Sequence, residues 1–162
     1  MKRIEVKIET DIETNSDKVW CIISDFENWN DWHKTSEMKG VELITINNSP
    51  RILKFNITNI PLKINLSRVE IVEGKSISWR GFLPFSQALL FGERKIKVIS
   101  RSGTSCRLIQ TETFHGLISR IVQKRLSAKY KKNYEILNQN IKRIAESQSN
   151  LPVQQTAKSS PR

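Results

Sequence analysis

Residues 114–146 most constrain how this chain can fold. After Gly116, apolar residues recur at helical spacing, which predicts one long amphipathic helix. A helix of about 30 residues is about 45 Å long. That is too long to be buried by helix packing alone in a chain of 162 residues, so its apolar face needs a sheet. The predicted apolar face carries Ile118, Ile121, Val122, Leu126, Tyr130, Tyr134, Leu137, Ile141 and Ile144.

The residues that precede this helix have the alternation of a sheet. Residues 4–12 alternate apolar with charged side chains, which is typical of a half-buried strand. Further alternating stretches follow between residues 41 and 114, and turn-forming clusters separate them. The phase slips by one residue near Ser67 and Arg68, which predicts a β-bulge and a bent strand. We therefore expect an α+β helix-grip fold, in which a curved antiparallel sheet of about seven strands wraps round the long C-terminal helix.

Two short helices are predicted between the first two strands. Asn15 is a good helix cap, and Asp17 places negative charge in the first turn. Trp29 and Trp32 follow at a spacing that puts both indoles on one side. This pattern fits a helical lid that seals one end of the sheet with its aromatic side. It is equally compatible with rings that line a ligand entrance.

Composition narrows the class of protein. The chain is 38% hydrophobic, which suits one globular domain, expected over residues 1–147. Two distant cysteines and two histidines give neither a disulfide framework nor zinc-ligand spacing, so we expect no metal, no cofactor and a reducing, cytoplasmic location. We found no signal peptide and no run long enough to span a membrane. Residues 148–162, rich in Ser, Gln and Pro, are expected to be a disordered tail.

The positive charge is unevenly distributed. Of 27 Lys and Arg residues only 6 lie in residues 1–50, against 10 of the 16 acidic residues. The basic remainder could attract an anionic membrane surface or nucleic acid, or it could simply be the solvated outer face of strands and helix. Specific nucleic-acid binding is not expected, because the basic residues of the last helix are not interleaved with aromatics that stack on bases.

Polar residues are predicted inside the sheet. Leu108 and Phe114 belong in the core, so strand alternation carries Gln110 and Glu112 inward with them. The hairpin register places Arg94 opposite residues 110–112. We therefore expect an inward Arg94–Glu112 pair with Gln110 nearby. Such a pair could fix the strand register, or it could orient the polar head of an apolar ligand.

Three separated stretches make the pattern recognisable. VWCIISDFENWNDW, SISWRGFLPFSQALLFGERKI and QTETFHGLISRI occur in this order within residues 3–146. Together they resemble the SRPBCC superfamily of START and Bet v 1-like proteins, within it the polyketide cyclase/dehydrase and lipid-transport group. The resemblance implies a deep apolar cavity between sheet and helix. In that group the third residue of the stretch 92–94 is commonly histidine, and this chain has Arg94.

These observations favour binding or transport of a hydrophobic small molecule, such as a lipid, a quinone or a polyketide-like compound. The alternative is an enzyme of the cyclase or dehydratase type with Glu112 as its base; non-specific nucleic-acid binding ranks third. The apolar segment 82–88 and the basic face of the helix suggest peripheral contact with an anionic membrane. The sequence leaves the oligomeric state open. The candidate ligand-binding residues are Trp32, Phe55, Trp79, Arg94, Gln110, Glu112, Phe114, Tyr130 and Tyr134.

Overall fold

The computed structural model describes residues 5–36, 38–46, 49–57, 60–82, 90–116 and 119–147. At residues 40, 46, 49–50, 55–57, 60–62 and 119–127 it describes the backbone alone. The apolar segment expected at 82–88 and the tail expected at 148–162 thus lie largely or wholly outside the described residues. The elements are β1 (Glu5–Ile12), α1 (Ser16–Ser24), the 3-10 helix η1 (Phe26–Asp31), β2 (Met38–Ile46), β3 (Ser49–Ile57), β4 (Ile60–Val72), β5 (Ser76–Phe82), β6 (Phe91–Ser102), β7 (Ser105–His115) and α2 (Ser119–Ser147).

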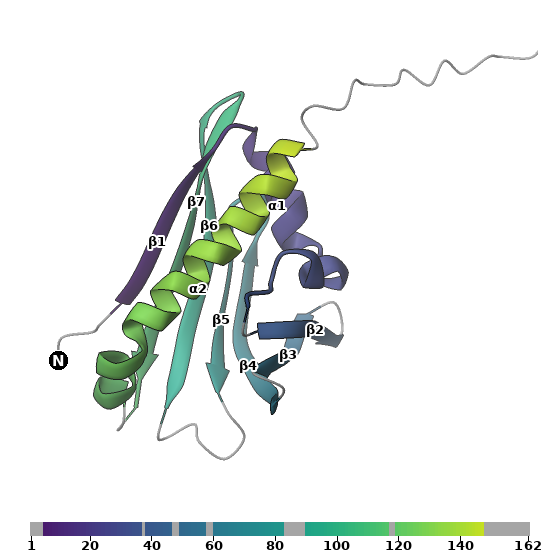
Figure 1. Ribbon diagram of the computed structural model, residues 1–162. Helices are drawn as coiled ribbons and strands as arrows, with labels where there is room; N and C mark the ends of the chain where they lie inside the picture. The colour runs from purple at the N-terminus through teal and green to yellow at the C-terminus, as the bar shows by residue number, and fades with distance from the viewer. Residues whose placement is uncertain are drawn as a thin grey trace, which may run out of the picture.

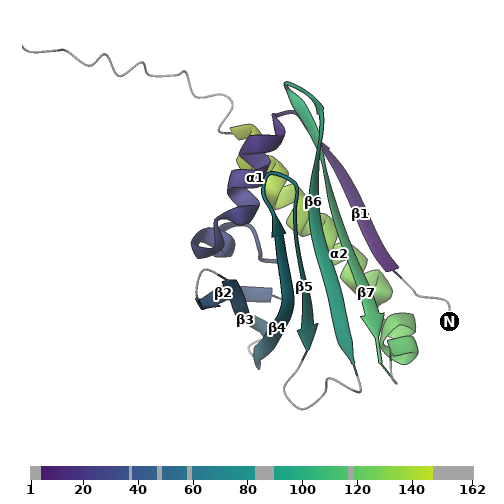
Figure 2. The ribbon, with the colours of Figure 1, turned by 180° about the vertical axis from the view of Figure 1, so that it is seen from behind.

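The seven strands form one antiparallel sheet in the order β1-β7-β6-β5-β4-β3-β2. Figure 1 shows the sheet curving round α2, which crosses the face made by β1, β7 and β6. Figure 2 shows the opposite, outer face, which is turned away from the helix. This arrangement confirms the α+β helix-grip prediction.

The local signals at the start of the chain act as expected. In β1, Val6, Ile8 and Ile12 are buried, whereas the charged residues between them are exposed. Asn15 caps α1, because its Oδ1 accepts a hydrogen bond from the backbone N–H of Lys18 at 3.0 Å.

The β-bulge predicted near Ser67 and Arg68 is present. The pairing of β4 with β5 shifts register between Ser67 and Glu70, and Arg68 has a φ of 50°. A residue other than glycine seldom adopts this left-handed conformation. Leu66 precedes the bulge and Ile71 follows it. Because the bulge adds one residue to β4, both residues still pair in register with β5.

Helix α2 buries the stripe that its spacing predicted, where side chains are described. Tyr134, Leu137 and Ile141 are buried, and Tyr130 and Ile144 are half-buried. The side chains of Ile118, Ile121, Val122 and Leu126 lie outside the described part. The sequence did not predict that Asn138, next to Leu137, would also be fully buried.

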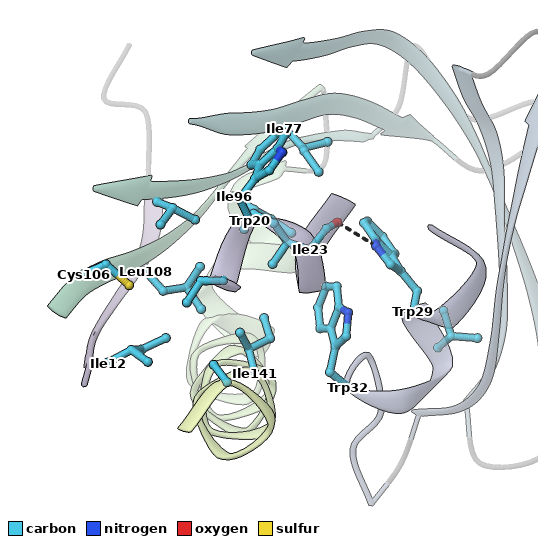
Figure 3. Packing of buried hydrophobic residues seen from close by; sticks show 14 of the residues in the cluster. Ile12, Trp20, Ile23, Trp29, Trp32, Ile77, Ile96, Cys106, Leu108 and Ile141 are labelled. Atoms are coloured by element: carbon cyan, nitrogen blue, oxygen red, sulfur yellow. Dashed lines mark hydrogen bonds between the residues drawn. The ribbon is translucent and has the colours of Figure 1, made fainter. Parts of the chain in front are cut away.

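The main apolar core lies between the sheet, α1, η1 and the C-terminal half of α2 (Figure 3). Trp29 and Trp32 are each 1% exposed there, and the Trp29 indole N–H donates to the Ile23 carbonyl at 2.9 Å. This burial favours the lid interpretation of the two rings. In the described part of the chain, no helix is long and apolar enough to cross a membrane.

Candidate ligand-binding site

The site is organised around Arg94, which points from β6 into the interior and is only 6% exposed. Its Nη1 lies 2.8 Å from Nε2 of His33, and its Nη2 donates to Oε1 of Gln110 at 2.5 Å. The guanidinium also lies over two aromatic rings, 5.4 Å from the centroid of Trp79 and 4.6 Å from that of Tyr134. Both distances are within the range of cation–π attraction.

Arg94 sits between two apolar clusters. Trp79 belongs to the main core with Trp29 and Trp32. Tyr134 belongs to a second cluster with Phe114, against which Tyr130 packs. The Tyr130 ring centroid lies 4.9 Å from that of Phe114 and 6.3 Å from that of Tyr134. A single cation is therefore surrounded by aromatic and aliphatic side chains from both ends of the interior.

A chain of buried amides ties Arg94 to α2 and β1. Nε2 of Gln110 donates to Oδ1 of Asn138 at 2.7 Å, and Nδ2 of Asn138 donates to Oγ1 of Thr10 at 3.0 Å. Gln110 and Asn138 are both fully buried. Because the Gln110 oxygen already accepts from Arg94, these bonds fix which way each amide faces. The polar chain thus aligns the helix with the strands at the level of Arg94.

The predicted strand register is correct, but the predicted Arg94–Glu112 pair is wrong in its contacts. Arg94 and Glu112 are directly opposite in the β6–β7 ladder. In the described part of the chain, however, the hydrogen bonds of Arg94 go to His33 and Gln110, while the Tyr134 hydroxyl donates a short bond to Glu112. The long arginine reaches past its cross-strand neighbour, and the carboxyl of Glu112 lies instead over Gly92.

Gly92 is needed for this placement. A Cβ added at Gly92 would collide with Oε1 of Glu112 and approach its Cδ to 3.3 Å. The glycine of the stretch 92–94 therefore makes room for a carboxyl group on the inner face of the sheet, which the sequence pattern alone did not indicate.

Burial and neighbouring charge set the protonation of the acidic groups. Burial raises the pKa of Glu112, and the positive charge of Arg94 and the bond from Tyr134 partly oppose that rise. Burial and the nearby Glu112 charge raise the pKa of Tyr130 to about 12, and the same two causes raise that of Tyr134. Both tyrosines stay protonated at neutral pH. Glu112 is thus a buried carboxyl whose pKa is raised and whose neighbours are a cation and a tyrosine hydroxyl.

His33 is a further candidate site residue, which was not among those predicted from the sequence. It is 1% exposed and stacks on Trp29, with ring centroids 5.4 Å apart. Burial, aided by the charge of Arg94, lowers the pKa of His33 well below 6.5. The ring is therefore neutral, and its Nε2 accepts from Arg94. The sequence does contain a signal for this placement: His33 comes four residues after Trp29, so a helical segment would put both side chains on the same side.

Several buried donors at this end have no acceptor. Nε1 of Trp32, Nδ1 of His33 and Nε of Arg94 are buried and lack hydrogen-bond partners within the described structure. With Nε2 of His33 accepting, its hydrogen is on Nδ1, so all three atoms are N–H donors. The rings of Trp32 and His33 are 5.1 Å apart, and His33 touches Arg94 directly. An unpaired buried donor costs about 1–3 kcal/mol, so an acceptor placed beside these three atoms would remove that cost.

The other predicted ligand-binding residues lie on the same inner side of the sheet, except for one whose side chain is not described. Trp32, Trp79, Gln110, Glu112, Phe114, Tyr130 and Tyr134 all lie on the inner side with Arg94, and the side chain of Phe55 lies outside the described part. Cys106 is fully buried, and burial raises its pKa, so it is a poor nucleophile. The described residues contain no cluster of three His, Cys, Asp or Glu side chains suited to a metal ion.

Fold and site together define a helix-grip protein with a polar centre inside an apolar interior. The aromatase/cyclase Zhui from Streptomyces superposes with a TM-score of 0.73 at 12% identity, over 92% of this chain and 97% of that one. Norcoclaurine synthase from Thalictrum flavum gives 0.70 at 11% identity, over 93% and 99%. A START superfamily protein from Mycobacterium smegmatis gives 0.62 at 16% identity, over 91% and 99%. These likenesses establish the fold.

The family follows from a sequence model. Residues 3–146 match the model of the polyketide cyclase / dehydrase and lipid transport family, so the chain belongs to that family. It is an SRPBCC protein of the ligand-binding or polyketide cyclase type. No curated protein matches it in sequence.

The neutral, buried state of His33 predicts a pH dependence. Its folded-state pKa lies below the ordinary value of 6.5, so below about pH 6.5 the unfolded chain binds a proton that the folded chain does not. This group's contribution to stability is therefore complete above that pH and falls by up to about 1.4 kcal/mol per pH unit below it. Denaturant unfolding at about pH 7 and about pH 5 should show that loss in the wild type but not in His33→Gln.

His115→Gln removes the other histidine of the chain and is the matched control. It should keep the wild-type loss. The pKa of Glu112 is raised, so that group acts in the opposite direction, but it is present in all three proteins and cancels in their comparison. An acid loss of the same size in His33→Gln and wild type would contradict a buried neutral His33.

The contact between Gly92 and Glu112 makes a second prediction. Gly92→Ala should lower the free energy of unfolding by about 1–3 kcal/mol, because the added methyl displaces the carboxyl. Gly103→Ala is the control, since a Cβ there meets nothing within 4 Å. Adding Glu112→Ala to Gly92→Ala should recover part of the loss in a double-mutant cycle. Equal losses at the two glycines, or strictly additive effects of the pair, would place Glu112 elsewhere.

Proposed function

We propose that this protein binds or carries a hydrophobic small molecule whose polar head has a hydrogen-bond acceptor. One observation carries the proposal: the unpaired N–H groups of Trp32, His33 and Arg94 lie together beside the main apolar core. Ligand sites of this kind combine a largely apolar lining with a few placed polar groups. The apolar body would lie against aromatic rings such as Trp79 and Tyr134.

The charge of Arg94 narrows the head group. Arg94 is positively charged and makes no hydrogen bond to a carboxylate among the described residues. Its hydrogen-bond partners, His33 and Gln110, are neutral and do not cancel its charge. A carboxylate, an enolate or a polarised carbonyl is the acceptor that gains most from such a donor. A lipid acid, a quinone or a polyketide-like compound has an acceptor of this kind on an apolar body.

A second candidate is an enzyme of the cyclase or dehydratase type. Glu112 favours it, because its pKa is raised and it is hydrogen-bonded to Tyr134 beside Arg94. A carboxyl of that kind can remove or return a proton next to a carbonyl, while the guanidinium stabilises the oxyanion that develops. Glu112→Gln would then abolish turnover and leave binding intact, whereas a carrier would be indifferent to that substitution.

Delivery at a membrane belongs to the same proposal. Lys131 and Lys132 are exposed on α2, and positive charge near an anionic surface attracts a protein to it. A cytoplasmic carrier with this basic helix could load from the inner leaflet of the membrane. The described residues carry no exposed aromatic platform that would favour single-stranded nucleic acid instead.

Native mass spectrometry tests the proposal directly. The purified wild type is expected to show a mass above that of the denatured chain, and solvent extraction should release an apolar compound with an acceptor group. Arg94→Gln should reduce its occupancy about tenfold or more, because a charged hydrogen bond to the head is lost. Arg101→Gln is the control, an exposed arginine on the same strand whose nearest acid is Asp11 at 3.6 Å.

Two outcomes would contradict the binding proposal. One is that Arg94→Gln retains the compound as well as wild type does, although both proteins are folded by circular dichroism. The other is that the wild type neither carries an apolar molecule nor takes one up from a mixture of fatty acids and quinones.

A further inference from the structure

The outer face of the sheet carries a second concave site, on the side away from α2 and Arg94's interior contacts. A hollow of about 280 Å³ opens there over β4, β5, β6 and β7. Figure 2 looks onto this face, on which these four strands lie side by side. The thickness of the sheet separates the hollow from the polar centre described above. Trp79 and Arg94 also border the hollow, but their side chains are buried on the inner face, so the two sites lie on opposite faces of the same strands.

One row of the lining combines a cation with two hydroxyls. Ser78 and Lys95 are direct cross-strand partners, and so are Lys95 and Thr111. Lys95 is exposed, and within the described part of the chain no hydrogen bond or ion pair joins any of these three side chains to another group. An ammonium flanked by two uncommitted hydroxyls offers donors that converge on one side of the sheet.

The next row contains an acid, but that acid is already paired. Glu93 accepts from Nη2 of Arg80 at 2.5 Å and from its Nε at 3.2 Å, and Nε2 of His115 lies 3.2 Å from it. Arg80 also lies over Phe91, 4.2 Å from the ring centroid. These bonds to Arg80 lower the pKa of Glu93 and keep its charge matched. Glu93 therefore does not cancel the charge of Lys95.

The β-bulge supplies a second free cation. Arg68 lines the same hollow and is exposed, and no ion pair or hydrogen bond engages it in the described structure. Its φ of 50° is unfavourable for a residue with a side chain. The residue with this unfavourable backbone conformation is therefore one that borders the hollow. Glu70, the acid nearest along β4, pairs in register with Ser78 and is not part of the lining.

We propose that this hollow binds the phosphate group of a small phosphomonoester or of a lipid head. Arg68 and Lys95 supply the charge, and the hydroxyls of Ser78, Thr111 and Thr113 supply further donors. A tetrahedral dianion with several oxygens is the ligand class that such a convergence of cations and hydroxyls suits best. The two sources share the phosphate chemistry and differ in whether a membrane presents it.

The test is a binding measurement on the full chain. Isothermal titration calorimetry with glycerol phosphate and with inorganic phosphate at low salt measures the soluble source. Sedimentation with vesicles of equal parts phosphatidylglycerol and phosphatidylcholine, against pure phosphatidylcholine, measures the lipid source. Lys95→Gln and Arg68→Asn should each weaken binding at least about threefold. Asparagine tolerates the left-handed backbone of Arg68, so the fold should be preserved.

Lys97→Gln is the matched control. Lys97 is the next outward residue on β6, it is exposed, and it lies outside the hollow. Binding of either phosphate source that depends on Lys95 and Arg68 but not on Lys97 supports the proposal and names the source. Equal weakening by all three substitutions would mean general charge attraction and overturn it. So would the absence of binding to both the soluble phosphates and the anionic vesicles.

Discussion

The burial of one positive charge, that of Arg94, is the constraint on which the interior depends. A charge in an apolar interior is costly unless hydrogen bonds and polarisable groups replace its water. Here the replacement comes from His33 and Gln110 and from the faces of Trp79 and Tyr134. These four groups belong to four separate parts of the chain, so the sheet, the lid and the long helix must all be in place before the cation is satisfied.

The same arrangement explains why the interior has two unequal halves. Towards β1 and α2, every amide of the Gln110–Asn138–Thr10 chain is paired, and this side is structural. Towards the lid, the donors of Trp32, His33 and Arg94 are unpaired, and a well-packed protein seldom retains such groups without a use. The paired half holds the guanidinium in place, and we propose that the unpaired donors of the other half bind the acceptor group of a ligand.

Periodicity was sufficient to predict the strands, the long helix, the bulge at Arg68 and the inward direction of Arg94, Gln110 and Glu112. Each follows from which side of one element a residue occupies. The partners could not be predicted in the same way. Whether Arg94 meets Glu112 or Gln110 depends on the reach of a long side chain. His33 and Asn138 come from segments far away in sequence, and their approach depends on how lid and helix pack. The room that Gly92 leaves for Glu112 has no periodic signal at all.

The role of Arg94 in ligand binding can be tested most directly through the side-chain NMR signal of its Nε–H, with Arg94→Lys used to assign that signal. The protein, stripped of any bound compound, would be titrated with decanoate, which has an apolar body and a carboxylate head. The Nε–H signal is expected to be that of a free group in the stripped protein, and to shift downfield and exchange more slowly with water once decanoate is bound. Binding of decanoate that leaves this signal unchanged would contradict the claim that Arg94 binds the polar head group of the ligand.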